Sequence, residues 1–171
     1  MESPIEKVKI LSTGAISATL VRMAYEMLER NFAEEALVLS GIGARGRYIA
    51  DRLETHLKEI SRMDVVRSDL LKVQGESGLA WADERLAPAV GGRPLILVDD
   101  VLYSGSTLLQ ALFLAVPLNP RTIQTAFLID RGHHHYPITH DYVGMEIATS
   151  LKQYIRFEVD EETGRAEAFI Y

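Results

Sequence analysis

The chain has 171 residues, no cysteine, a hydrophobic content of 47% and a net charge of −6. This length predicts one domain over residues 1–171, the lack of cysteine excludes disulfides and thiolate metal sites, and the acidic balance argues against binding polyanions over the whole surface. No apolar run is long enough to span a membrane, and the start of the chain does not resemble a secretion signal, so we expect a cytoplasmic protein without a membrane partner.

The first elements follow a strand and helix pattern. Apolar and charged residues alternate over residues 5–11, which predicts a short edge strand. Ser12 or Thr13 can cap a helix whose apolar face continues to about Asn31. A buried strand is then expected over residues 36–40.

The second strand leads into a glycine-rich stretch over residues 41–47, followed by a helical pattern over residues 48–60. Arg45 and Arg47 suit phosphate, so the stretch is a second candidate anion loop. A dinucleotide fingerprint has less support, because the acidic pair of the chain lies far downstream. A plain glycine-rich turn with arginines facing solvent stays an alternative.

A third strand is predicted over residues 63–70, and after it the pattern loses its period. Residues 71–92 therefore read as a lid that closes over a site, with a disordered segment as the alternative. Trp81 would either anchor this lid on an apolar surface or pack on the face of the sheet.

The most informative stretch begins with an apolar strand over residues 95–98 that runs into Asp99 and Asp100. A small-residue turn over residues 104–107 then opens a helix expected from about Ser106 to about Val116. Free N–H groups and hydroxyls at a helix start hold a phosphate, and carboxylates accept hydrogen bonds from ribose hydroxyls. The stretch predicts a sugar phosphate site at the carboxyl edge of a parallel sheet.

The alternative for this stretch is structural, with the two acids capping a turn and Ser106 capping the helix. A P-loop is excluded, because no Gly-Lys-Ser/Thr follows the turn.

The last third of the chain predicts a strand over residues 121–129 and a hairpin over residues 154–170. Between them, His133, His134 and His135 raise the question of a metal site. Adjacent side chains point in different directions and no Glu or Cys stands at ligand spacing, so a metal is disfavoured.

The stretch over residues 98–107 resembles the phosphoribosyl pyrophosphate (PRPP) signature of the type I phosphoribosyltransferases. Residues 128–133, 137–138, 141–144 and 149–150 are similar to the pyrimidine operon attenuation proteins, a family of uracil phosphoribosyltransferases that also bind messenger RNA. The similarity covers the chain from about Ser12 onward. It implies an α/β fold with a mostly parallel central sheet flanked by helices, a lid or hood segment, a C-terminal hairpin and a homo-oligomer.

The resemblance also implies ligands and roles. The substrates would be PRPP and a nucleobase, with uracil the first choice, and Mg²⁺ would be held mainly by substrate and water. A cis peptide would stand at Ala44-Arg45, and the lid would exclude water. The catalytic residues would be Asp99, Asp100 and Arg131. PRPP would be bound by Gly43, Ala44, Arg45, Val101, Leu102, Tyr103, Ser104, Gly105, Ser106 and Thr107, and the site would be lined further by Arg67, Asp69 and Asp130.

The chain departs from the family pattern at three places. Ser104-Gly105-Ser106-Thr107 stands where the family usually has Thr-Gly-Arg-Thr, and Arg67-Ser68-Asp69 replaces Arg-Asp-Asp. Thr139 and Met145 are uncharged where relatives carry basic residues on the RNA face, and Glu146 adds a negative charge there. A regulator that binds PRPP and pyrimidine operon messenger RNA with little turnover therefore stays the alternative function.

Overall fold

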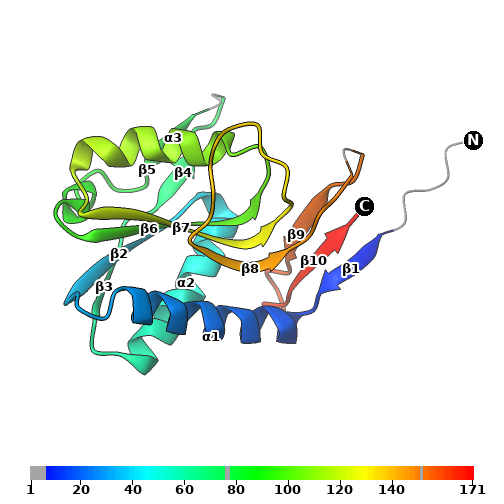
Figure 1. Ribbon diagram of the computed structural model, residues 1–171, viewed down its shortest axis with the longest axis horizontal. Coiled ribbons are helices and arrows are strands. Elements are labelled where there is room, and N and C mark those ends of the chain that lie inside the picture. Colours follow the sequence, from blue (N-terminus) through cyan, green and yellow to red (C-terminus); the bar gives the residue numbers. More distant parts are fainter. Residues whose placement is uncertain (1–6, 76–77, 151) are drawn as a thin grey trace, which may run out of the picture.

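The computed structural model describes residues 7–75, 78–150 and 152–171, and a five-stranded sheet forms its centre (Figure 1). All neighbouring strands of this sheet are parallel, in the order β3-β2-β6-β7-β8. The strands comprise β2 (Ala36–Gly41), β3 (Asp64–Arg67), β6 (Pro94–Leu102), β7 (Thr122–Asp130) and β8 (Tyr142–Glu146). The central strands β6 and β7 are almost wholly buried, as expected for a sheet that is covered on both faces.

Helices cover both faces of the sheet. The helices α1 (Thr13–Arg30) and α2 (Gly43–Ile60) lie below it in Figure 1, and α3 (Ser106–Ala115) lies above it, followed by a short 3₁₀ turn, η2 (Val116–Leu118). Each face has its own apolar core. The predicted cap of α1 is confirmed, because the Ser12 hydroxyl accepts a hydrogen bond from the Ala15 N–H at 3.2 Å.

A three-stranded antiparallel sheet stands beside the central one. It has the order β1-β10-β9, with β1 (Val8–Leu11), β9 (Ile155–Val159) and β10 (Ala166–Ile170). The predicted C-terminal hairpin and N-terminal strand are both found here, although Ile5 and Glu6 lie outside the described residues. We call this sheet the hood.

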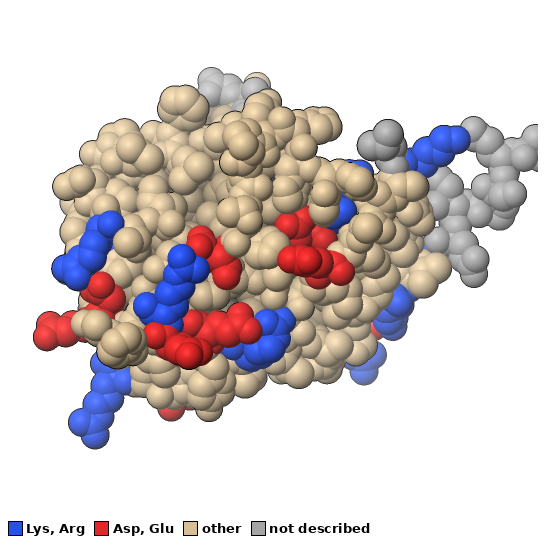
Figure 2. All heavy atoms as spheres, viewed as in Figure 1, with Lys and Arg blue, Asp and Glu red and all other residues tan. Residues whose placement is uncertain are grey.

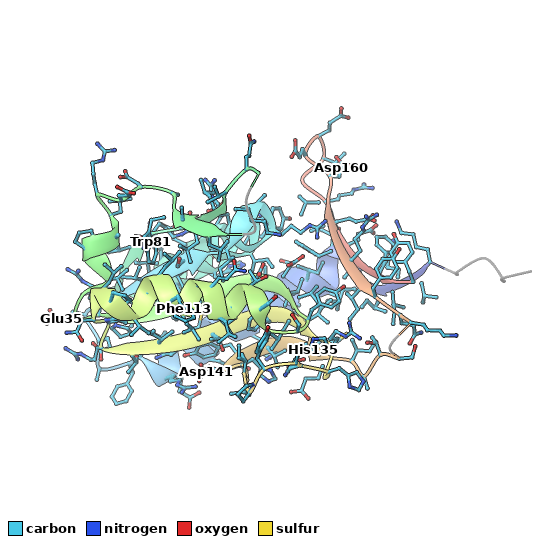
Figure 3. The ribbon with its side chains drawn as sticks, turned by 90° about the horizontal axis from the view of Figure 1, so that it is seen from above. Glu35, Trp81, Phe113, His135, Asp141 and Asp160 are labelled. Carbon is cyan, nitrogen blue, oxygen red and sulfur yellow. The ribbon has the colours of Figure 1, made fainter. Side chains whose placement is uncertain are left out.

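The predicted lid contains regular structure that the sequence pattern did not indicate. The strands β4 (Leu70–Lys72) and β5 (Leu79–Trp81) form an antiparallel pair, and a 3₁₀ turn, η1 (Ala87–Val90), follows. Trp81 is half-buried and packs against the apolar core on the α3 side of the sheet. Figure 3 shows it beside α3. These strands are too short to give a readable period.

The predicted fold class is confirmed, with three changes of boundary. The helix α2 begins at Gly43 rather than Tyr48, the third strand divides into β3 and β4, and β6 continues through both acids to Leu102. Charged side chains gather over the lower part of the face shown in Figure 2, whereas the upper part, over α3, is almost free of them. Within the described residues, no helix is long and apolar enough to cross a membrane.

Candidate active site

A cavity of about 410 Å³ lies where the ends of β2 and β6 meet the starts of α2 and α3. This is the carboxyl edge of the parallel sheet, where open α/β folds bind ligands. The cavity brings together segments that are far apart in the sequence. Its lining consists of Ile42, Gly43, Ala44, Arg45, Lys72, Asp99, Asp100, Val101, Tyr103 and Thr107.

One end of the cavity is the N-terminus of α2. The first hydrogen bond of the helical ladder joins the Gly46 N–H to the Ile42 carbonyl at 3.2 Å. The N–H groups of Gly43, Ala44 and Arg45 come before that bond, in the helix turn whose donors have no partner within the helix. This end of the cavity therefore presents backbone donors and the positive end of the helix dipole to an anion.

Gly46 lets this helix begin directly over the end of β6. A Cβ atom at Gly46 would stand 2.5 Å from the Val98 carbonyl oxygen and 3.4 Å from Asp99 Oδ1. The close approach explains why an α-helix replaces the predicted loop. The predicted cis peptide at Ala44-Arg45 is wrong, because the described residues contain none.

The other end of the cavity is the N-terminus of α3. Residues 104–107 form the turn into this helix and its first two residues, and we call them the phosphate loop after the role predicted for them. Gly105 is the N-cap residue, with φ of +88°, and its carbonyl accepts from the Leu109 N–H at 3.0 Å. The Ser104 hydroxyl accepts from the Ser106 N–H at 3.3 Å. The alternative in which Ser106 caps the helix is wrong, since Gly105 holds that position.

Asp99 and Asp100 lie between the two helix starts. The Asp100 N–H donates to Asp99 Oδ1 at 2.9 Å, and the exposed Arg45 places its guanidinium 3.4 Å from Asp100 Oδ2. Burial, together with the neighbouring Asp100 carboxylate, raises the pKa of Asp99 well above its ordinary range. Both carboxylates line the cavity although they belong to one strand.

Lys72 is a cavity residue that sequence reasoning missed. It comes from β4, and its Cε atom lies 3.8 Å from where a Cβ atom on Gly43 would stand, over the start of α2. Its charge acts on Asp99 and lowers the pKa of that group, against the larger effect of burial. No local pattern marks Lys72, because only the pairing of β4 with β5 turns it toward the cavity.

Tyr103 lines the cavity, and Arg131 lies next to Tyr103 but outside the lining. The Tyr103 hydroxyl accepts from the Ile155 N–H at 2.8 Å and also donates to the Ile155 carbonyl, so it ties the end of β6 to β9. Burial raises the pKa of this phenol. The Arg131 guanidinium lies 5.3 Å from the centre of the Tyr103 ring. Leu102 faces away from the cavity, into the core on the α3 side.

Comparison with known proteins decides the family. The phosphoribosyl transferase domain model matches residues 8–162. The chain belongs to the phosphoribosyltransferase family. The bifunctional protein PyrR of Enterococcus faecalis is 38% identical over 167 residues, which cover 92% of this chain and 93% of the relative. The PyrR of Listeria welshimeri is 35% identical over an alignment of 176 positions, which covers 96% of each chain.

Solved phosphoribosyltransferases show the same fold. The hypoxanthine-guanine phosphoribosyltransferase of Bacillus anthracis superposes with a TM-score of 0.70 at 21% identity, covering 90% of this chain and 87% of its own. The hypoxanthine enzyme of Trypanosoma cruzi has a TM-score of 0.70 at 16% identity, over 81% of each chain. The prediction of a type I phosphoribosyltransferase close to the attenuation proteins is confirmed, and with it an enzyme of the pentosyltransferase class.

In this phosphoribosyltransferase, Arg67 and Asp69 lie beside the cavity rather than in its lining. The Arg67 guanidinium pairs with Asp51 at 2.6 Å and Asp69 at 2.7 Å, and Asp69 Oδ1 also accepts from the Gly41 N–H at 2.8 Å. Burial alone would lower the pKa of Arg67, but its hydrogen bonds to carboxylates hold it above the ordinary value. The pair thus supports the turn that leads into α2.

Asp130 also lies outside the cavity lining. It is 4% exposed and accepts hydrogen bonds from the Gly132 N–H, His134 and His140. The three consecutive histidines do not converge, and in the described part of the chain no group of three or more His, Cys, Asp or Glu could hold a metal ion.

The donor set of the cavity fits Mg²⁺ in one respect. Asp100 keeps 14% of its side chain exposed and presents carboxylate oxygen, the type of ligand that this hard cation prefers. Asp99 lies next to it and would offer a second carboxylate to such an ion.

Proposed function

We propose that this phosphoribosyltransferase transfers the phosphoribosyl group of PRPP to uracil and releases pyrophosphate, with Mg²⁺ as its cofactor. One observation carries the proposal: a single cavity has a helix N-terminus at each end and an acid pair between them. PRPP has the matching shape, since its ribose carries an anion at each end.

The two helix starts divide the anions between them. The phosphate loop would hold the 5′-phosphate with backbone N–H groups and with the hydroxyls of Ser104, Ser106 and Thr107. The start of α2, together with Arg45 and Lys72, would hold the pyrophosphate. The cations stand at the end where negative charge grows as the leaving group departs, which is where they contribute most to rate.

The acid pair would act on the ribose. Asp99 and Asp100 hold the ribose hydroxyls by hydrogen bonds, and their negative charge favours the positive charge that develops on the ring. The bond from C1′ to the pyrophosphate oxygen breaks and the bond from C1′ to N1 of uracil forms, while the N1 proton passes to the departing pyrophosphate. Mg²⁺, held mainly by substrate and water, would supply positive charge that stabilises the departing pyrophosphate.

The base would lie beside Tyr103 and Arg131, under the hood. Support for uracil comes from the resemblance to the attenuation proteins and from the 38% identity to PyrR, a protein named as bifunctional. Lys72, from the start of the predicted lid, lines the cavity, and the lid would keep water from the reacting ribose.

The test is pyrophosphate release from PRPP and Mg²⁺ with uracil, hypoxanthine, guanine, xanthine or adenine. We expect release with uracil, and a fall of about 10³-fold in kcat/KM in the double variant Asp99→Asn, Asp100→Asn, with PRPP binding retained. Release with a purine alone would overturn uracil as the base. Tight PRPP binding without release for any base would favour a ligand-sensing regulator instead.

On the surface where the resemblance places RNA, Arg22 donates to the Val143 and Gly144 carbonyls, and its charge is paired with Glu26 at 2.6 Å. Glu146 is 68% exposed at its side chain, and Arg30 pairs with Asp141 at 2.7 Å. Catalysis is therefore our first proposal and messenger RNA binding the second, supported by the naming of the relatives as bifunctional. We also propose a homo-oligomer, since Phe113 of α3 (Figure 3) and Val116 of η2 are exposed. The part of the surface over α3 is almost free of charge (Figure 2).

A further inference from the structure

The segment that joins β7 to β8, residues 131–141, packs against the phosphate loop. The His135 N–H donates to the Ser104 carbonyl at 3.1 Å, and Ile138 Cδ1 lies 3.0 Å from where a Cβ atom on Gly105 would stand. Figure 3 shows His135 near the start of α3. The position of this segment, which we call the histidine loop, therefore sets where the backbone of the phosphate loop can lie.

One buried carboxylate holds the histidine loop. Asp130 Oδ1 accepts from the Gly132 N–H at 2.7 Å and contacts His134 Nε2 at 2.8 Å, and Oδ2 contacts His140 Nδ1 at 2.8 Å. Two of the partners come from the first part of the loop and the third from its end. A single anion at the end of β7 thus fixes the first part of the loop and its end, where Thr125 of β7 also bonds to Thr139 and Asp141.

His140 bridges two carboxylates. Its Nδ1 faces Asp130, and its Nε2 lies 3.1 Å from Glu146 Oε1 on β8. A carboxylate only accepts hydrogen bonds, so His140 can donate to both neighbours only as the imidazolium, whereas a neutral ring donates to one. His134 needs a single N–H for its bond to Asp130.

Few other charges face this cluster. Asp141, next to His140 in the chain, is paired with Arg30 of α1 at 2.7 Å, and its Oδ2 also accepts from the Thr125 N–H. Arg131 extends toward Tyr103 at the end of β6. The groups that act on the two imidazoles are therefore Asp130 from β7 and Glu146 from β8.

We propose that Asp130, His134 and His140 are positioning residues for PRPP, which fix the phosphate loop and Arg131 through the histidine loop without touching substrate. The proposal rests on the proposed function, because it assigns the 5′-phosphate to the phosphate loop. Arg131 follows Asp130 directly in the chain, and its buried Nε has no hydrogen-bond partner among the described residues. We call Asp130 with its partners Gly132, His134 and His140 the clamp. Because Asp130 directly precedes Arg131, the clamp also fixes the position of Arg131.

The clamp predicts that the affinity for PRPP falls as pH rises. Burial alone would raise the pKa of Asp130, but the Gly132 N–H and the two imidazoles hold it below its ordinary value, so this carboxylate stays charged at neutral pH. Histidine side chains in general change charge between about pH 5 and 8. An imidazolium at position 140 donates to both carboxylates and a neutral ring to only one, so the number of hydrogen bonds in the cluster depends on pH.

The experiment compares two double variants of the full chain. His134→Leu, His140→Leu removes both donors, whereas His134→Gln, His140→Asn puts an amide N–H close to each lost ring N–H. His133→Leu, in the same loop but outside the cluster, is the control. PRPP binding in the presence of Mg²⁺, without a base, is measured by calorimetry from pH 6 to 8, and thermal unfolding confirms that each variant is folded.

We expect the leucine pair to bind PRPP about tenfold more weakly at pH 6, and the amide pair and His133→Leu to stay within about twofold of the unchanged chain. The dissociation constant of the unchanged chain for PRPP, divided by that of the amide pair, should rise roughly fivefold from pH 6 to 8, because amides do not titrate. This ratio cancels the titration of PRPP itself.

Two results would overturn the clamp. One is a leucine pair that binds PRPP as well as the unchanged chain, and the other is an amide pair as weak as the leucine pair. If the leucine pair does not fold, the amide pair and its pH ratio decide alone. If the unchanged chain does not bind PRPP, the proposed function itself is wrong. The experiment therefore distinguishes failure of the clamp from failure of the proposed function.

Discussion

The two helices that begin at the cavity would hold an anion by different means. The start of α3 has small hydroxyl side chains, a glycine at positive φ and the histidine loop packed behind it. The start of α2 is flanked by Arg45 and Lys72, of which Arg45 is half exposed and paired only loosely with Asp100. The α3 end is neutral and is packed against the histidine loop, whereas the α2 end is cationic and open to solvent.

The difference corresponds to the two anionic ends of PRPP, the 5′-phosphate and the pyrophosphate. The 5′-phosphate stays on the product, so an end that recognises it by shape serves binding without needing to respond to the reaction. The pyrophosphate gains charge and then leaves, so cations on flexible side chains suit that end. The lost guanidinium of the phosphate loop, Ser106 in place of an arginine, is consistent with a charge-free α3 end.

The largest expected effect comes from removing the cations at the α2 end. In Arg45→Met, Lys72→Met, kcat/KM for PRPP should fall about 10²-fold to 10³-fold, mainly through kcat, because the charge that these groups stabilise grows in the transition state. Steady-state kinetics at varied PRPP measures this. Lys58→Met, at the other end of α2, is the control and should leave kcat unchanged. A change in KM alone would contradict the contrast drawn between the two ends.

A smaller effect is expected from crowding the α3 end. Gly105→Ala puts a Cβ at φ of +88° and 3.0 Å from Ile138 Cδ1, which costs about 1 to 3 kcal/mol and shifts the phosphate loop. We expect KM for PRPP to rise about tenfold with kcat nearly kept. Gly14→Ala, where a Cβ meets no atom within 4 Å, is the matched control and should not change KM. Equal KM values for the two variants would contradict the prediction.

The smallest effect concerns the acid pair between the ends. The pKa of Asp99 is raised in the folded protein, so the folded state binds a proton more readily than the unfolded state. Stability is therefore lost as pH rises from the unfolded pKa toward the folded one. Asp99→Asn should melt a few degrees above the unchanged chain at pH 7, and the gap should close toward pH 4. A gap that is constant with pH would contradict the shift.

Much of the fold could be predicted from the sequence, because buried strands and amphipathic helices carry their own patterns. The apolar run before Asp99, the cap at Ser12 and the C-terminal hairpin were each readable locally. The start of α2 was not, since glycines permit a loop as well as a helix, and the choice depends on how closely Gly46 approaches β6.

The site shows the same division. Asp99, Asp100, Thr107 and Arg45 were found from motif chemistry, and the structure brings them to one cavity. Lys72 was missed because three-residue strands leave no period. Arg67, Asp69 and Asp130 were placed in the site by resemblance, whereas their side chains are engaged in hydrogen bonds that support its walls. Such support depends on contacts between distant segments, which a local pattern does not contain.

The hydroxyl of Tyr103 has a consequence for the order of events in a catalytic cycle. It joins the residue just before the phosphate loop to both backbone groups of Ile155 in β9. A substrate that steadies the phosphate loop would thereby steady the hood as well, before any base has arrived. The geometry thus favours an order of binding in which PRPP enters first and orders the hood, under which the base then binds.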